Sequence, residues 1–127
     1  MKNLSEYCIE VGHELVVIFD HRPLYNRGLI ADIGVVTKVT EKRISIKVPS
    51  ITKPVIFNKS DGFEIGEGAL NLELVTEEWR EKINLNKMQL KTMWIASNIR
   101  QMNHLQFSKE FCEKMIELYN TTKLTID

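Results

Sequence analysis

Short apolar runs with alternating polar positions fill the first 75 residues, and glycine, proline, asparagine and aspartate separate them. Ile44, Ile46 and Val48 alternate with polar residues, which is the clearest pattern of a half-buried strand in the chain. Five short strands with such turns favour a small, strongly bent sheet that closes into a barrel. The predicted strands span residues 14–19, 33–40, 44–48, 55–57 and 70–75.

The second and third strands are predicted to form a β-hairpin through a polar turn at residues 40–43. Strict alternation in the second strand would give it two regular faces. One face would carry Ile33, Val35, Thr37 and Val39, and the other Val36, Lys38 and Thr40.

After residue 76 the apolar residues recur at spacings of three and four, with no glycine or proline, which is typical of helices. Thr76 is expected to cap a helix that runs to about residue 104, as one bent helix or as two, because Asn84 and Asn86 weaken its middle. Ser108 is expected to cap a last helix. The short connection at 103–107 favours an antiparallel helical hairpin.

This pattern predicts an α+β chain, with a barrel at 1–76 and a helical hairpin packed on it at 77–127. Trp79 and Trp94 point in directions that differ by roughly 60°, at about 100° per residue, so one broad face should meet the barrel or the last helix. The remaining apolar residues are either covered within the chain or form a partner or dimer surface. A neighbouring seam contains Leu85, Met88, Thr92, Ile95, Ile99 and Met102.

Composition and charge narrow the class of protein. The chain has 127 residues, of which 43% are hydrophobic and 27% charged, as expected for one folded domain or a small domain with an appendage. Its 17 basic and 17 acidic residues balance, which argues against strong nonspecific DNA binding. No apolar run is long enough to cross a membrane, and the first residues lack the apolar segment of a signal peptide, so a cytoplasmic location is expected.

The two cysteines and three histidines do not have the spacing of a zinc or redox site, so no metal or cofactor is expected. Cys8 and Cys112 are expected to be buried or half-buried thiols, and a disulfide between them is left open by the sequence.

Catalysis is the minority hypothesis. The chain has no glycine-rich phosphate loop, nucleophile elbow or Cys/His nucleophile pattern. Asp20, His21 and Arg22 are the one compact set of titratable groups, and acid/base chemistry would also need a second carboxylate such as Asp32 or Asp61. A hydrolase or nuclease built on Asp20 and His21 therefore ranks third among the functions considered.

A binding surface is the favoured interpretation of the basic residues. Tyr25 lies between Arg22 and Arg27 on a long loop, and an aromatic flanked by arginines suits either base stacking or a protein hot spot. Lys42 and Arg43 on the hairpin would join them if the barrel closes as expected. Residues 1–76 hold nine basic and ten acidic groups, a net charge of −1, so a strong phosphate-binding surface is not indicated.

Two stretches carry a resemblance to known barrels. Residues 11–18, VGHELVVI, resemble the opening of SH3-like and KOW-type barrels, and residues 34–39, GVVTKV, followed by 43–48, RISIKV, are similar to their next hairpin. Residues 57–62, FNKSDG, with 72–79, LELVTEEW, add a similarity to small phage-encoded proteins that join such a barrel to a C-terminal helical hairpin.

This resemblance implies a five-stranded SH3-like barrel and a role in binding rather than catalysis. The expected function is that of an accessory protein that binds and modulates a host protein complex, such as transcription machinery or a defence nuclease, in the host cytoplasm. The alternative is a KOW-like module that binds RNA or DNA. The chain is expected to act as a monomer, or as a homodimer through its helical region, without a membrane partner.

Overall fold

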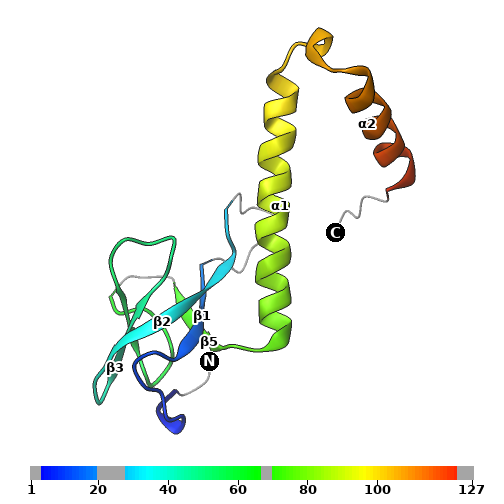
Figure 1. The fold of residues 1–127 in the computed structure, drawn as a ribbon. Helices are drawn as coiled ribbons and strands as arrows, with labels where there is room; N and C mark the ends of the chain where they lie inside the picture. Colours follow the sequence, from blue (N-terminus) through cyan, green and yellow to red (C-terminus); the bar gives the residue numbers. More distant parts are fainter. Residues whose placement is uncertain (1–3, 20–27, 67–69, 123–127) are drawn as a thin grey trace. The chain divides into compact units, whose positions relative to one another are not determined.

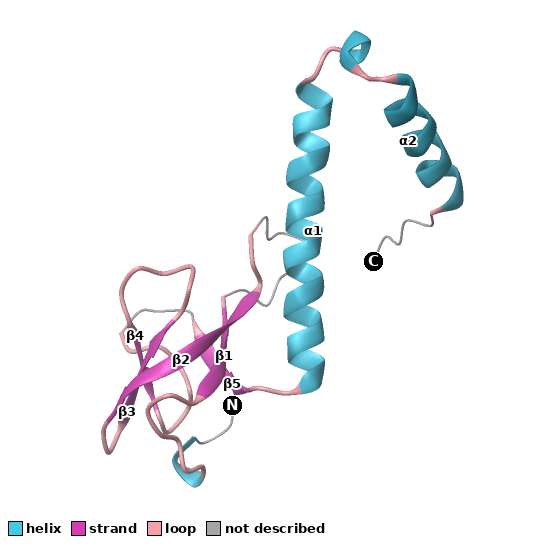
Figure 2. Cartoon of the chain, in the orientation of Figure 1, coloured by secondary structure: helices cyan, strands magenta, loops and turns pink. Residues whose placement is uncertain are grey.

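A computed structural model describes residues 4–19, 28–66 and 70–122 (Figure 1). The chain divides into two compact units, residues 1–92 and 93–127. A curled five-stranded antiparallel sheet is followed along the chain by two helices (Figure 2), which confirms the predicted α+β class.

The five strands occur close to their predicted positions and run antiparallel to their neighbours. Their order across the sheet is β4-β3-β2-β1-β5. The predicted hairpin is confirmed as β2 and β3. The strands are β1 Glu14–Ile18, β2 Ala31–Val39, β3 Arg43–Lys47, β4 Val55–Asn58 and β5 Asn71–Leu74.

The sheet curls so far that its two edge strands share one neighbouring segment. The Asn58 N–H of β4 donates to the Phe63 carbonyl at 2.9 Å, and the Leu72 N–H of β5 donates to the Gly62 carbonyl at 2.8 Å. Gly62 adopts a φ of 74°, which favours glycine, in the turn that follows β4. The sheet is therefore a half-barrel whose edges are both partly paired.

β1 lies between two strands and is buried on both faces, which explains its uninterrupted apolar sequence. Leu15 and Val17 pack into the cluster inside the half-barrel, whereas Val16 and Ile18 pack into a second cluster on the other face. Ile44, Ile46 and Val48 all lie in the first cluster, so the strand face predicted for them is confirmed.

The predicted regular faces of β2 are wrong. A register shift between Val36 and Lys38 in its pairing with β3 marks a bulge. Val36 and Val39 consequently pack against the same core cluster, although strict alternation placed them on opposite faces. Val35 is exposed.

The helix α1 spans Glu77–Gln101 as a single element, which settles the choice between one helix and two. The Thr76 hydroxyl accepts a hydrogen bond from the Trp79 N–H at 3.1 Å, as expected of a cap. A short 3₁₀ turn, η2, follows at His104–Gln106, and the helix α2 spans Lys109–Thr121. Ser108 caps α2 by accepting from the Phe111 N–H at 3.1 Å, as predicted.

The first unit holds the sheet, the 3₁₀ turn η1 at Leu4–Glu6 and α1 as far as Thr92. Ile83 of α1 is buried against Val16, Ile18 and Ala31, so the start of the helix covers one face of the sheet. The second unit holds the end of α1, η2 and α2.

Both cysteines are free thiols. Cys112 is half-buried, as expected, but the expectation of a buried Cys8 is wrong because its side chain lies exposed after η1.

Candidate functional site

The predicted partner-binding residues fall into two groups. Arg22, Tyr25 and Arg27 lie outside the described residues, as do Asp20 and His21, so their roles stay predictions. Lys42 and Arg43 are described and exposed at the turn between β2 and β3.

The two groups attach to opposite ends of β2. Residues 20–27 connect Phe19 to Gly28, and the Phe19 N–H donates to the Ile30 carbonyl at 2.8 Å, just before β2 begins. Lys42 and Arg43 follow the last residue of β2. Its nine residues rise by about 3.3 Å each, so the two points of attachment are roughly 26 Å apart. A single surface would need the loop to reach along the whole strand.

The structure adds a basic residue that sequence reasoning missed. The Lys59 N–H donates to the Lys42 carbonyl at 2.9 Å, and Arg43 pairs with Asn58 in the ladder between β3 and β4. Lys42, Arg43 and Lys59 therefore gather at one end of the sheet. The register of the β3–β4 pair brings Lys59 beside Lys42 and Arg43. The sequence pattern did not specify this register, so it could not predict that Lys59 lies there.

Both carboxylates considered as partners for an acid/base pair have structural contacts. Asp32 is buried, accepts a hydrogen bond from the Ile33 N–H at 2.8 Å, and lies 3.2 Å from the Lys87 ammonium. Asp61 accepts from the Phe63 N–H at 2.9 Å within its turn. These contacts account for both side chains in the fold.

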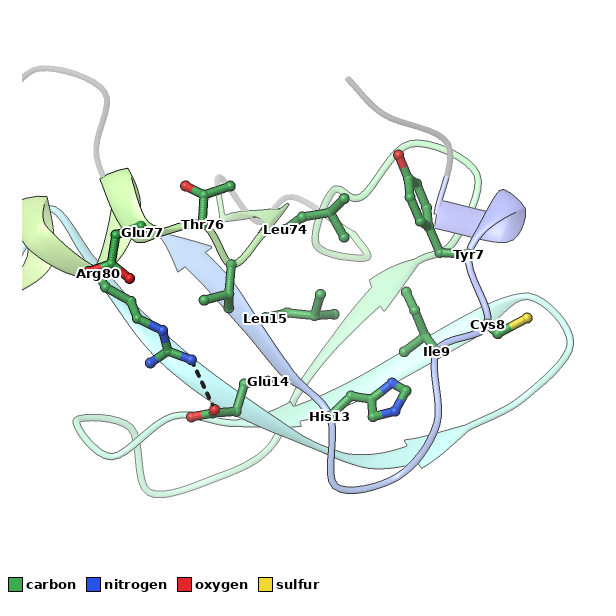
Figure 3. A pocket seen from close by; sticks show the side chains of 11 residues that line it. Tyr7, Cys8, Ile9, His13, Glu14, Leu15, Leu74, Thr76, Glu77 and Arg80 are labelled. Atoms are coloured by element: carbon green, nitrogen blue, oxygen red, sulfur yellow. Dashed lines mark hydrogen bonds and ion pairs between the residues drawn. The ribbon is translucent and has the colours of Figure 1, made fainter.

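A groove of about 630 Å³ lies where η1 and β1 approach the end of β5 and the start of α1 (Figure 3). Apolar side chains contribute to its walls, among them Ile9, Leu15 and Leu74. Glu14 and Arg80 form an ion pair at its border, with 3.2 Å between the guanidinium and the carboxylate, and both side chains are about half exposed.

The groove offers apolar contacts to a ligand, and the Glu14–Arg80 ion pair at its border has no net charge. A half-exposed pair of this kind contributes only about 0–1 kcal/mol, so it is free to exchange with a ligand. His13 already accepts a hydrogen bond from the Glu10 N–H at 3.1 Å through Nδ1. Within the described residues no three metal-ligating side chains gather at one place.

Most of the exposed large apolar side chains among the described residues lie in the helical region. No residue between 93 and 122 is buried. On α2 the apolar side chains of Met115, Leu118 and Tyr119 are 39%, 56% and 77% exposed. Phe107 and Phe111 contact each other, with ring centroids 5.1 Å apart, at the start of that helix. An amphipathic helix with this much exposed apolar surface is typical of an interaction site.

Comparison of the chain with models of protein families, with curated proteins and with solved structures finds no match. Among the described helices, none combines the length and the apolar character that spanning a membrane requires.

Proposed function

We propose that the chain is a non-catalytic binding protein, a phage-type accessory protein that binds a host protein complex in the host cytoplasm and modulates it. Transcription machinery and a defence nuclease are the classes of target that the sequence resemblance implies. In this proposal the curled sheet is an SH3-like barrel, and the end of the helical region contacts the target.

The exposed apolar face of α2 is the observation that carries the proposal. Phe111, Met115 and Leu118 follow the spacing i, i+4, i+7, by which a helix inserts its apolar side chains into a groove of a partner protein. The charged residues of α2 lie beside and opposite this face, and four of them are paired within the helix. Its ion pairs join Lys109 to Glu113 at 3.8 Å and Glu110 to Lys114 at 2.9 Å.

The charge of α2 favours a protein target over a nucleic acid. The helix carries three glutamates and two lysines, a net charge of −1. A phosphate backbone would be repelled by this balance, whereas an apolar groove on a protein accepts the face between Phe111 and Tyr119.

A pull-down from a bacterial lysate with the full chain, with and without nuclease, tests the proposal through two matched variants. Leu118→Glu places a carboxylate on the apolar face, whereas Asn120→Glu adds the same charge two residues away, on the other side of α2. A protein that survives nuclease treatment should be captured by the wild type and by Asn120→Glu but lost with Leu118→Glu. The helical signal in far-UV circular dichroism checks that both variants keep α2 folded.

Two results would overturn the proposal: loss of every partner after nuclease treatment, or equal capture by the wild type and Leu118→Glu. The first result would direct attention to RNA or DNA.

The RNA- or DNA-binding alternative rests on a different observation, the gathering of Lys42, Arg43 and Lys59 at one end of the sheet. Under this alternative, Lys42→Glu combined with Arg43→Glu would weaken nucleic-acid binding, and wild-type binding would fall steeply with added salt because counterions are released. Leu118→Glu would have no effect on it. A flat salt response would reject the alternative.

A further inference from the structure

The strand β5 ends in an open edge. The Leu72 N–H donates to the Gly62 carbonyl at 2.8 Å, so the backbone of Leu72 bonds on the side away from β1. Hydrogen-bonding directions repeat every second residue of a strand, so the N–H and the carbonyl of Leu74 point the same way. Among the described residues, none bonds to the Leu74 backbone on that side. One donor and one acceptor of the sheet are therefore available at this edge.

The groove of Figure 3 lies along this edge, on the inner face of the curled sheet. Leu74 packs against the cluster inside the half-barrel, and its cross-strand neighbour Leu15 belongs to that cluster. Both side chains line the groove, and Tyr7 and Ile9 line it from the segment after η1 (Figure 3). In a strand added at the edge, the side chain directly opposite Leu74 would lie on the same face and enter this groove.

A second cavity, of about 210 Å³, lies on the other face of the same edge. Successive side chains of a strand point to opposite faces, so Glu73 faces away from the side of Leu74. Glu73, Glu78 and Trp79 line this cavity, which shares Leu74 and Thr76 with the groove. The edge therefore has one cavity for each of the two directions in which the side chains of an added strand would point.

Carboxylates dominate the lining of the two cavities. Among the described lining residues are four glutamates and two cations, a net charge of −2. Both cations have a contact, because Arg80 pairs with Glu14 and the Lys82 ammonium lies 4.8 Å from a tryptophan ring centroid. The other three glutamates form no ion pair with a described residue, so a basic ligand is favoured over an acidic one. They are Glu73, Glu77 and Glu78.

We propose that an extended segment of a partner protein, with a basic–apolar–basic core, adds to the sheet at the edge of β5. The backbone of its central residue exchanges two hydrogen bonds with Leu74, and the central apolar side chain enters the groove. The adjacent basic side chain extends into the second cavity, toward Glu73 and Glu78. All these residues belong to the first compact unit, so this site is separate from the face of α2 that carries the proposed function.

Fluorescence anisotropy of a labelled peptide with the full chain tests the proposal. The probe is a short capped peptide with a lysine–valine–lysine core between threonines, and its binding should saturate below about 1 mM. A peptide with glutamates in place of the lysines should bind at least about tenfold more weakly, because it meets the unpaired carboxylates. A peptide N-methylated at the valine lacks the N–H that the Leu74 carbonyl accepts, and it should also bind at least about tenfold more weakly.

Variants of the chain test the same contacts from the other side. Glu78→Lys turns an attraction into a repulsion and should weaken binding of the lysine peptide by about fivefold or more. Glu41→Lys is the matched control, since Glu41 is exposed and lines neither cavity, and it should bind like the wild type. Leu74→Pro removes the outward N–H, a change that an edge strand tolerates, and should weaken binding of the lysine peptide. Circular dichroism checks that each variant is folded.

Three results with the peptides would overturn the proposal. They are no saturation at about 1 mM, equal binding of the N-methylated peptide, and equal loss of binding in Glu78→Lys and Glu41→Lys. Light scattering of the free chain adds a fourth result, because a dimer that Leu74→Pro dissociates would assign the edge to a second copy of the chain. Leu118→Glu should bind the peptide like the wild type, so failure of this site and failure of the proposed function are distinguishable.

Discussion

The side-chain carbonyl of Asn86 accepts a hydrogen bond from the backbone N–H of Ile30 at 3.0 Å, which connects α1 to the residue that precedes β2. The next residue along the helix repeats the connection, because Lys87 lies 3.2 Å from the carboxylate of Asp32. Together with the buried Ile83, these two contacts fix how the start of α1 lies against the sheet.

Replacing Asn86 with alanine should lower the free energy of unfolding by about 1 kcal/mol, because the Ile30 N–H loses its partner in a partly buried position. Asn84→Ala is the matched control, since Asn84 is exposed on the same helix. Alanine should raise the stability there by about 0.5 kcal/mol through its better helix propensity. Urea unfolding measures the free energy of unfolding of both variants. Equal changes in Asn86→Ala and Asn84→Ala would show that the Asn86 hydrogen bond contributes nothing to stability.

Asp32→Ala should cost more stability than Lys87→Ala. Loss of the buried carboxylate leaves the Ile33 N–H without its acceptor and should cost about 1–3 kcal/mol. Lys87 is half exposed, so water screens its ion pair and its removal should cost less than about 1 kcal/mol. Unfolding of both single variants and of the double variant gives the coupling between them. A larger loss of stability with Lys87→Ala than with Asp32→Ala would contradict this prediction.

Asn86 also shows what the sequence could and could not predict. Periodicity predicted the helix around it, but local propensity suggested a break at Asn84 and Asn86, because the tertiary partner of Asn86 is 56 residues away in the chain. The five strands and their hairpin followed from alternation and turn residues. The bulge between Val36 and Lys38 and the approach of Lys59 to Lys42 depend on strand register, which alternation alone leaves open.

Gly34 is the position in β2 where a side chain has no room. An added Cβ would collide with the Ile46 side chain and lie 3.2 Å from the Lys47 carbonyl. Gly34→Ala should therefore lower the free energy of unfolding by about 1–3 kcal/mol, as overpacking does in cores. Val35→Thr, at an exposed neighbouring position of the same strand, should change it by less than about 0.5 kcal/mol. If Gly34→Ala left the free energy of unfolding unchanged, β2 and β3 would have to separate easily enough to make room for the added methyl group.

The two tryptophans of α1 should differ in stability and in fluorescence. The sequence predicted that both tryptophans lie on one face that meets the rest of the chain. Trp79 does pack against the cluster around Ile83. The Lys82 ammonium lies 4.8 Å from the centroid of the Trp79 ring. Trp94 lies beyond Thr92, outside the unit that contains the sheet, and is 66% exposed.

Trp79→Ala should therefore cost about 2–3 kcal/mol of unfolding free energy, somewhat less than a fully buried aromatic, whereas Trp94→Ala should cost less than about 0.5 kcal/mol. In a Trp79→Phe variant the remaining emission comes from Trp94 and should resemble that of tryptophan in water. A blue-shifted emission from Trp94, or a large loss of stability on its removal, would mean that this side of α1 is covered by another part of the chain.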